Sequence, residues 1–187
     1  MSVTNIELLN KIEEWEKELT DNSRHIHFAL LEVFIEFEKF LTHAFISYAL
    51  KEKGKNSFAP ELRLQFDDKV HLQGLLQCSK PYIDYIKKVK EVRKFIFKES
   101  TCPFHKVFST ADFNTNFLHI KIMRDFIAHQ SEESKAKYVK TILNSGRYIK
   151  VNTYLNTLSK HENISNYSRY INALKFYSEV ICDGRSS

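Results

Sequence analysis

The stretch that most restricts the fold runs from Arg24 to Lys53 and contains neither glycine nor proline. Ser23 can cap a helix over this stretch and Gly54 can end it. Its apolar side chains recur at helical spacing and include Leu30, Phe34, Phe37, Leu41, Ala44 and Tyr48. Because they are too numerous for one narrow stripe, we expect a central helix that is covered from more than one direction.

The composition favours helices in the rest of the chain as well. Four glycines and three prolines in 187 residues disfavour a turn-rich β-sandwich. With 43% hydrophobic and 13% aromatic residues the chain can fill one substantial core. We therefore predict an all-α fold of long antiparallel helices in a single domain, residues 1–187, in which residues 1–22 form a helical extension and residues 183–187 fray.

The spacing of apolar residues predicts six further helices, over residues 5–19, 60–77, 80–98, 113–129, 132–143 and 167–181. Pro60 suits the first turn of its helix, which can be broken at Asp67 and Asp68, and Ser79 can cap the next helix. Either Ser131 or Ser134 can restart the chain as a helix after His129. These signals predict helices joined by limited connections.

Two segments are less regular. Residues 99–112 are predicted to form a loop or a broken helix. The turn signal Asn144-Ser145-Gly146 precedes the segment from Arg147 to Tyr154, whose β-branched and aromatic residues suit a strand of one short β-hairpin. The same segment can instead enter a helix through Leu158.

Charge and cysteine usage leave the function open. The formal net charge of +5 and the isoelectric point near 9.0 are compatible with a polyanionic ligand, although many proteins without one are equally basic. Residues 1–18 lack the pattern of a secretory signal, and no apolar stretch approaches the ~20 residues of a membrane span, so we expect a cytoplasmic protein. The separated Cys78, Cys102 and Cys182 suit reduced thiols, and we expect neither a metal nor a cofactor.

Basic side chains recur on one side of the helix predicted over residues 80–98. Lys87, Lys90 and Lys94 form this ridge with Lys98, which either lies along an RNA backbone or is a solvated face. His105 and Lys106 follow in the predicted loop. They would contact a bound phosphate if that loop folds over the helix of residues 113–129, and otherwise they are exposed and uninvolved.

Three ionisable residues lie late on the helix predicted over residues 113–129. Arg124 falls on an apolar stripe that is formed by Phe113, Phe117, Ile120, Ile127 and Ala128. This position requires an anionic partner or a subunit interface. Asp125 and His129 are four residues apart on one face, where a carboxylate can hold an imidazole through a hydrogen bond. The alternative is that Arg124 anchors a buried ion pair and His129 only ends the helix.

The run Arg124-Asp125-Phe126-Ile127-Ala128-His129 resembles the signature of the HEPN superfamily, an arginine followed by a polar residue, three more residues and a histidine. The resemblance extends loosely over residues 24–182, including the long Phe-rich helix. It implies a HEPN-like helical bundle and a metal-independent RNA endonuclease. His129 would then be the general base or acid, Arg124 would stabilise the charge on the scissile phosphate, and Asp125 would orient one of them.

The spacing of the signature points to quaternary structure. Arg124 and His129 diverge by about 140° on a regular helix, so we expect a homodimer that combines two copies of both residues, as in HEPN ribonucleases. The enzyme would be a toxin or phage-defence effector, held by an antitoxin or regulatory protein, or an RNA-processing nuclease. Ser131 stands where the HEPN toxins paired with nucleotidyltransferases have a tyrosine. The alternatives are a non-catalytic HEPN-like dimer that binds RNA, nucleotide or protein, and a helical scaffold with an accidental signature.

Overall fold

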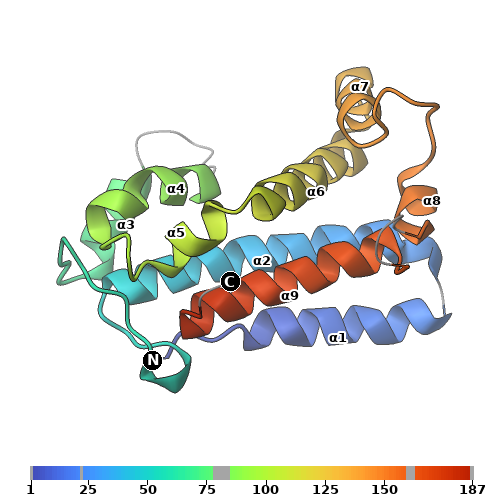
Figure 1. Ribbon diagram of the computed structural model, residues 1–187. Coiled ribbons are helices and arrows are strands. Elements are labelled where there is room, and N and C mark those ends of the chain that lie inside the picture. Colours follow the sequence, from blue (N-terminus) through green and yellow to red (C-terminus); the bar gives the residue numbers. More distant parts are fainter. Residues whose placement is uncertain (1, 22, 78–84, 159–162, 186–187) are drawn as a thin grey trace. The chain divides into compact units, whose positions relative to one another are not determined.

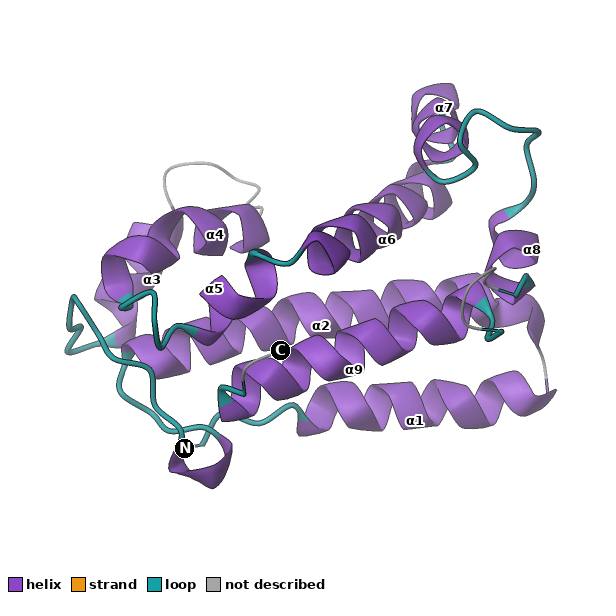
Figure 2. Cartoon of the chain, viewed as in Figure 1, coloured by secondary structure: helices purple, strands orange, loops and turns teal. Residues whose placement is uncertain are grey.

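The computed structural model describes residues 2–21, 23–77, 85–158 and 163–185 (Figure 1). These residues form nine α-helices and two short 3-10 helices, and they contain no β-strand (Figure 2). The all-α prediction is confirmed. Extended residues in the described chain meet only as isolated bridges, such as that between Leu62 and Phe97, so the short β-hairpin is not formed there. None of the described helices combines the length and the apolar character needed to cross a bilayer.

The chain divides into two compact units. Unit 1 comprises Met1–Leu8, Glu36–Thr110 and Phe176–Ser187, and unit 2 comprises Leu9–Ile35 and Ala111–Lys175. Three helices contribute residues to both units, namely α1 (Ile6–Asp21), α2 (Ile26–Ala49) and α9 (Asn166–Asp183). The units are therefore not two successive segments of the chain, and the assignment of a single domain stays a prediction.

Unit 1 is built around an aromatic cluster. It contains α3 (Lys69–Gln77), α4 (Tyr85–Ile96) and α5 (Pro103–Phe108) together with the second half of α2. The rings of Phe45, Phe97 and Phe104 lie 5.4 to 5.8 Å apart between centroids and are fully buried. The face of α4 opposite its lysines is buried, and it consists of Ile86, Val89, Val92 and Ile96.

The C-terminal end of α9 is held by α2 within unit 1. The Tyr48 hydroxyl, in a side chain that is 1% exposed, donates hydrogen bonds to the carbonyls of Ile181 (2.7 Å) and Cys182 (3.0 Å). Carbonyls in the last turn of a helix lack partners within the helix, so Tyr48 satisfies them from outside. Gly54 passes so close that a Cβ there would lie 2.1 Å from the Cys182 carbonyl oxygen and 2.2 Å from the Tyr48 hydroxyl.

Unit 2 contains α6 (Ala111–His129), α7 (Glu132–Thr141) and α8 (Val151–Asn156) with parts of α1, α2 and α9. Phe117 packs on Phe34 of α2, with 5.3 Å between the ring centroids. His119 Nδ1 lies 3.1 Å from the Tyr170 hydroxyl, which lies 3.0 Å from that of Tyr154. These contacts join α6, α8 and α9 inside the unit.

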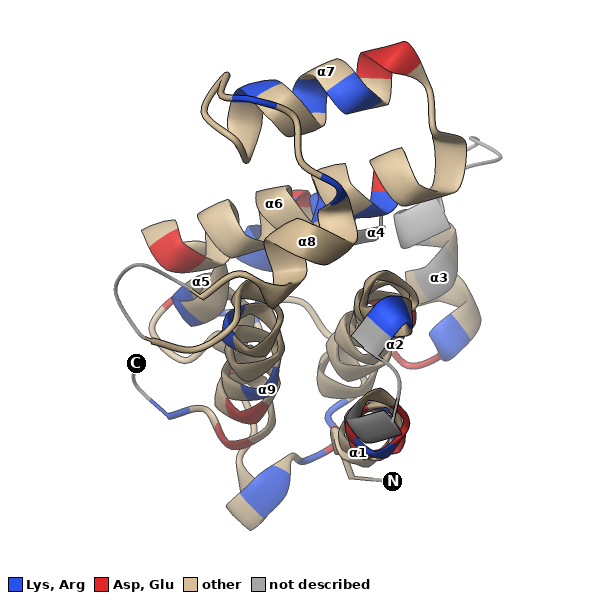
Figure 3. Cartoon of the chain, turned by 90° about the vertical axis from the view of Figure 1, so that its right-hand side faces the viewer, with Lys and Arg blue, Asp and Glu red and all other residues tan. Residues whose placement is uncertain are grey.

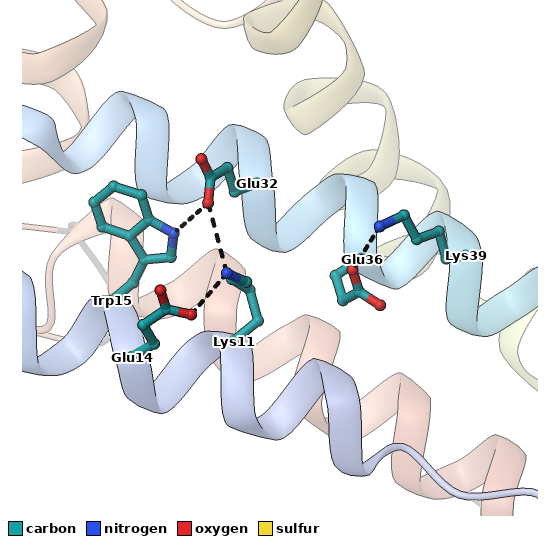
Figure 4. A network of polar contacts seen from close by, with 6 residues as sticks. All are labelled: Lys11, Glu14, Trp15, Glu32, Glu36 and Lys39. Atoms are coloured by element: carbon teal, nitrogen blue, oxygen red, sulfur yellow. Dashed lines mark hydrogen bonds and ion pairs between the residues drawn. The ribbon is translucent and has the colours of Figure 1, made fainter.

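Exposed polar contacts join α1 to α2 in unit 2 (Figure 4). The Trp15 indole N–H donates to Glu32 Oε2 at 3.1 Å, and Lys11 Nζ lies 3.8 Å from the same oxygen and 2.6 Å from Glu14 Oε2. Figure 4 also shows the ion pair between Lys39 and Glu36 on the part of α2 that belongs to unit 1. Since these pairs are largely exposed, they add little to stability compared with the buried rings.

The helix predicted from Pro60 begins only at Lys69. Asp68 accepts a hydrogen bond from the His71 N–H at 2.7 Å and thereby caps α3. The preceding residues pair instead with the end of α4, where the Arg63 N–H donates to the Ile96 carbonyl at 2.8 Å. The proposed cap Ser79, together with Cys78, lies outside the described residues.

Four further observations concern the other elements. The long helix α2 ends at Ala49 rather than Lys53, and Lys51 follows with a φ of 65°. Ile6, the first residue of α1, is 60% exposed. Of the two alternatives for residues 147–154, the entry into a helix is found, because α8 begins at Val151. The tail expected to fray is bonded at Gly184, whose N–H donates to the Val180 carbonyl at 2.9 Å.

Candidate functional site

The signature residues lie where α6 turns into α7. Helix α6 ends at His129, and Gln130 adopts a φ of 47° while its N–H donates to the Phe126 carbonyl at 2.9 Å. Ser131 then caps α7, because its Oγ accepts a hydrogen bond from the Ser134 N–H at 3.2 Å. Of the two serines proposed to begin this helix, Ser131 is therefore the cap. Only two residues separate the helices, so the first turns of α7 lie against the end of α6.

A depression of about 230 Å³ opens at this junction. Its polar lining includes Asp125 and His129 from α6 and Glu133 and Lys137 from α7. Asp125 and His129 are thus on one side of α6, as their four-residue spacing predicts. His129 is exposed, so its imidazole is open to solvent and to a ligand.

The charges around this depression are arranged in pairs. Asp125 Oδ1 lies 3.2 Å from Arg124 Nε, and Glu133 Oε1 lies 2.7 Å from Lys137 Nζ. The hydrogen bond to Glu133, followed by its charge and by the weaker effect of Asp125, raises the pKa of Lys137. Lys137 lowers the pKa of Glu133 in return. Within the described chain no hydrogen bond joins Asp125 to His129.

Arg124 is joined to this cluster by its ion pair with Asp125. It lies on α6 beside Ile120 and Met123, which are fully buried, while its own side chain is 32% exposed. Phe117 and Ile127, also on the predicted apolar stripe, are half-buried. Arg124 is not among the residues that line the depression. The structure therefore places Asp125 and His129 on one depression and pairs Arg124 with Asp125.

Lys137 is a member of this site that was not predicted from the sequence. Its place depends on the two-residue turn, which directs α7 back along α6. Figure 3 shows the lysines of α7 following an acidic start, and the residues concerned are Glu132 and Glu133, then Lys135, Lys137 and Lys140. The capping serine and the four-residue step from Glu133 to Lys137 are the local features that could have indicated it.

The lysine ridge lies on α4 in unit 1. Lys87 and Lys94 are exposed, and Lys90 is half-buried. Lys90 Nζ lies 5.3 Å from the centroid of the Phe108 ring, and Lys94 Nζ lies 5.0 Å from that of Phe95. The ridge is thus a basic face on an amphipathic helix, and two of its ammonium groups lie over aromatic rings.

His105 and Lys106 are part of helix α5, so of the two alternatives for this segment the broken helix is found. Pro103 occupies the first turn of α5, a position that suits its fixed φ and missing N–H. His105 Nε2 lies 3.0 Å from Glu99 Oε1, and Lys106 donates to the Gly184 carbonyl. Both side chains therefore have partners within unit 1, whereas Arg124, Asp125 and His129 belong to unit 2.

The described residues contain no group of three or more histidine, cysteine and acidic side chains arranged to hold a metal ion. The thiols of Cys102 and Cys182 are buried and free, and burial raises the pKa of Cys182 to about 12. Neither thiol is therefore set up as a nucleophile. Comparison of the chain with models of protein families, with curated proteins and with solved structures gives no match.

Proposed function

We propose that the protein is a metal-independent RNA endonuclease that acts as a homodimer, with the depression at the α6–α7 turn as its catalytic site. One observation carries this proposal: Asp125 and His129 line a single open depression together with Lys137. An exposed imidazole, a carboxylate and a cation are the groups that such a reaction requires. Arg124, paired with Asp125 at 3.2 Å, supplies a second cation.

The reaction follows from the chemistry of RNA. The 2′-oxygen forms a bond to phosphorus, the bond from phosphorus to the 5′-oxygen breaks, and a 2′,3′-cyclic phosphate and a 5′-hydroxyl result. His129 takes the proton of the 2′-hydroxyl as general base, a contribution of about 10²- to 10⁴-fold in rate. Arg124 and Lys137 stabilise the additional negative charge on phosphorus, and Asp125 holds Arg124 in position.

A second copy of the chain completes this site. The 5′-oxygen needs a proton as it leaves. The attacking 2′-oxygen and the leaving 5′-oxygen lie on opposite sides of phosphorus, so a single His129 that takes the proton of the 2′-hydroxyl does not also reach the 5′-oxygen. A two-fold dimer supplies His129 twice, as base and as acid. It would also cover the stripe beside Arg124, where Phe117 and Ile127 are half-buried.

Such an enzyme would need restraint in the cell, because cleavage of cellular RNA stops growth. We therefore extend the proposal to a toxin or phage-defence effector whose site is held inactive by an antitoxin or a regulatory protein. The exposed position of His129 at the end of α6 supports this extension, since a partner could cover the site without entering the core.

Incubation of the purified protein with mixed RNA in EDTA tests the proposal. We expect fragments that end in 2′,3′-cyclic phosphate, and we expect His129→Ala to lose at least about 100-fold in rate with unchanged circular dichroism. His43→Ala, which removes an exposed histidine of α2, is the matched control and should cleave as the wild type does. Equal cleavage by His129→Ala, or no cleavage of varied RNAs by the wild type, would refute the catalytic role.

A further inference from the structure

A second depression lies at the same turn and is aromatic rather than acidic. It has a volume of about 570 Å³, within the range of ligand sites, and all its lining residues belong to unit 2. Phe28 of α2, Phe126 of α6 and Tyr148 before α8 supply its rings. Lys135 and Lys150 contribute two positive charges to its lining, and Glu132 contributes one negative charge. We call this depression the aromatic groove.

Two aromatic side chains of the aromatic groove are largely exposed to solvent. Phe28 is 47% exposed and Tyr148 is 41% exposed. Behind them, the fully buried Tyr138 stacks on Phe126 with 5.4 Å between centroids and meets Tyr148 edge to face at 6.4 Å. Tyr148 also meets Phe126 at 82°, so these two rings form a corner. Fixed and partly exposed rings of this kind offer flat surfaces to a planar ligand.

The charged groups beside these rings suit an anion. Lys135 Nζ lies 5.6 Å from the centroid of Tyr148 and 3.4 Å from both oxygens of Glu132, while Lys150 is exposed at the end of the connection to α8. Gln130, whose exposed amide also lines the groove, can both donate and accept hydrogen bonds. A planar group that hydrogen-bonds at its edge and carries a phosphate fits this combination.

The aromatic groove and the catalytic depression share one turn. Asp125 and His129 line the catalytic depression, whereas Phe126, Ile127 and Gln130 line the aromatic groove. Neighbouring residues at the end of α6 therefore line the catalytic depression and the aromatic groove in turn. Consecutive Cα atoms are about 3.8 Å apart, so a chain of nucleotides bound at one depression reaches the other.

We infer that the aromatic groove is a base-binding subsite, which takes one unstacked nucleobase of single-stranded RNA next to the phosphate at His129. This inference rests on the proposed function and adds the form of the substrate. A base inside a duplex is stacked on both sides and cannot lie on Tyr148 or Phe28, so the subsite selects single strands or loops.

The affinity of the His129→Ala protein for labelled RNA tests this inference without cleavage, by fluorescence anisotropy in EDTA. Adding Tyr148→Ala should weaken binding of a single-stranded RNA about five- to 150-fold, the contribution of one stacked base. Tyr148→Phe keeps the ring and should bind as the parent does. Binding of a duplex of the same length should be equal in all three.

The outcomes separate this inference from the proposed function. Tyr148-dependent binding of single strands by a wild type that does not cleave would support the subsite and refute the enzyme. Cleavage by the wild type together with unchanged single-strand binding in Tyr148→Ala would support the enzyme and overturn the subsite. Equal losses for single strand and duplex would also overturn it, as would Tyr148-dependent binding of a free mononucleotide without any effect on RNA.

Discussion

Replacing Tyr48 by phenylalanine removes one buried hydroxyl group and leaves its ring in place. The ring keeps its edge-to-face contacts with Phe58 and Phe104, at centroid distances of 5.8 and 6.2 Å. The hydroxyl's hydrogen bonds to the carbonyls of Ile181 (2.7 Å) and Cys182 (3.0 Å) are lost. The substitution therefore isolates the contribution of this cap on α9 from that of the aromatic packing.

The expected loss can be worked from these contacts. One O–H group serves two acceptors, so its net contribution is about that of one or two hydrogen bonds, while a buried acceptor left without a partner costs about 1–3 kcal/mol. Tyr48 is 1% exposed, so water does not replace the hydroxyl. We expect Tyr48→Phe to lower the free energy of unfolding by about 1–2 kcal/mol.

Urea unfolding followed by circular dichroism measures this loss. The midpoint should fall with an unchanged slope, since the folded state keeps its surface. Tyr148→Phe is the matched control, because Tyr148 is 41% exposed and removal of its hydroxyl should change stability by less than about 0.5 kcal/mol. A wild-type midpoint for Tyr48→Phe, or an equal loss of stability in the two variants, would show that the Tyr48 hydroxyl does not stabilise the end of α9.

Three further results are expected. Gly54→Ala should destabilise the protein by more than about 2 kcal/mol in the same urea assay, since its Cβ would lie 2.1 Å from the Cys182 carbonyl oxygen; a smaller loss would mean that this contact is not rigid. Lys137→Ala should slow RNA cleavage about tenfold or more, while Lys140→Ala on the exposed side of α7 should not, and equal rates would remove Lys137 from the site. Burial, followed by the charge of Arg169, lowers the pKa of His119 below its usual value of 6.5. As the pH falls, His119 therefore binds a proton in the unfolded chain before it does so in the folded protein. The free energy of unfolding should therefore fall as the pH drops through about 6.5, and His119→Gln should show a weaker fall between about pH 7.5 and pH 5.5.

The parts of the fold that depend on local signals could be predicted from the sequence. The last helix is one example, since it was expected from the spacing of its apolar residues, and Tyr170, Leu174 and Val180 are buried in α9. The start of α3 follows the break that Asp67 and Asp68 indicate, and Asp68 caps the helix. The non-helical structure of the residues after Pro60 could not be predicted, because they pair with the distant end of α4.

The candidate site also contains parts that the sequence predicts and parts that it does not. The common side of Asp125 and His129 follows from helical periodicity alone. Lys137 could not be assigned, because its position depends on the direction in which α7 leaves the turn. The ion pair between Arg124 and Asp125 joins adjacent residues, whose side chains diverge by about 100° on an ideal helix. Helical periodicity therefore does not predict this pair, which forms through the flexibility of the arginine side chain.

The two-residue connection at Gln130 and Ser131 makes the site sensitive to chain length. An inserted or deleted residue there would move every side chain of α7 relative to α6 and separate Lys137 from Asp125, even with all site residues retained. The connection over residues 144–150, which is neither helix nor strand, can vary in length at less cost to the catalytic depression. During evolution the spacing from His129 to Lys137 should therefore resist insertions more strongly than the approach to α8 does.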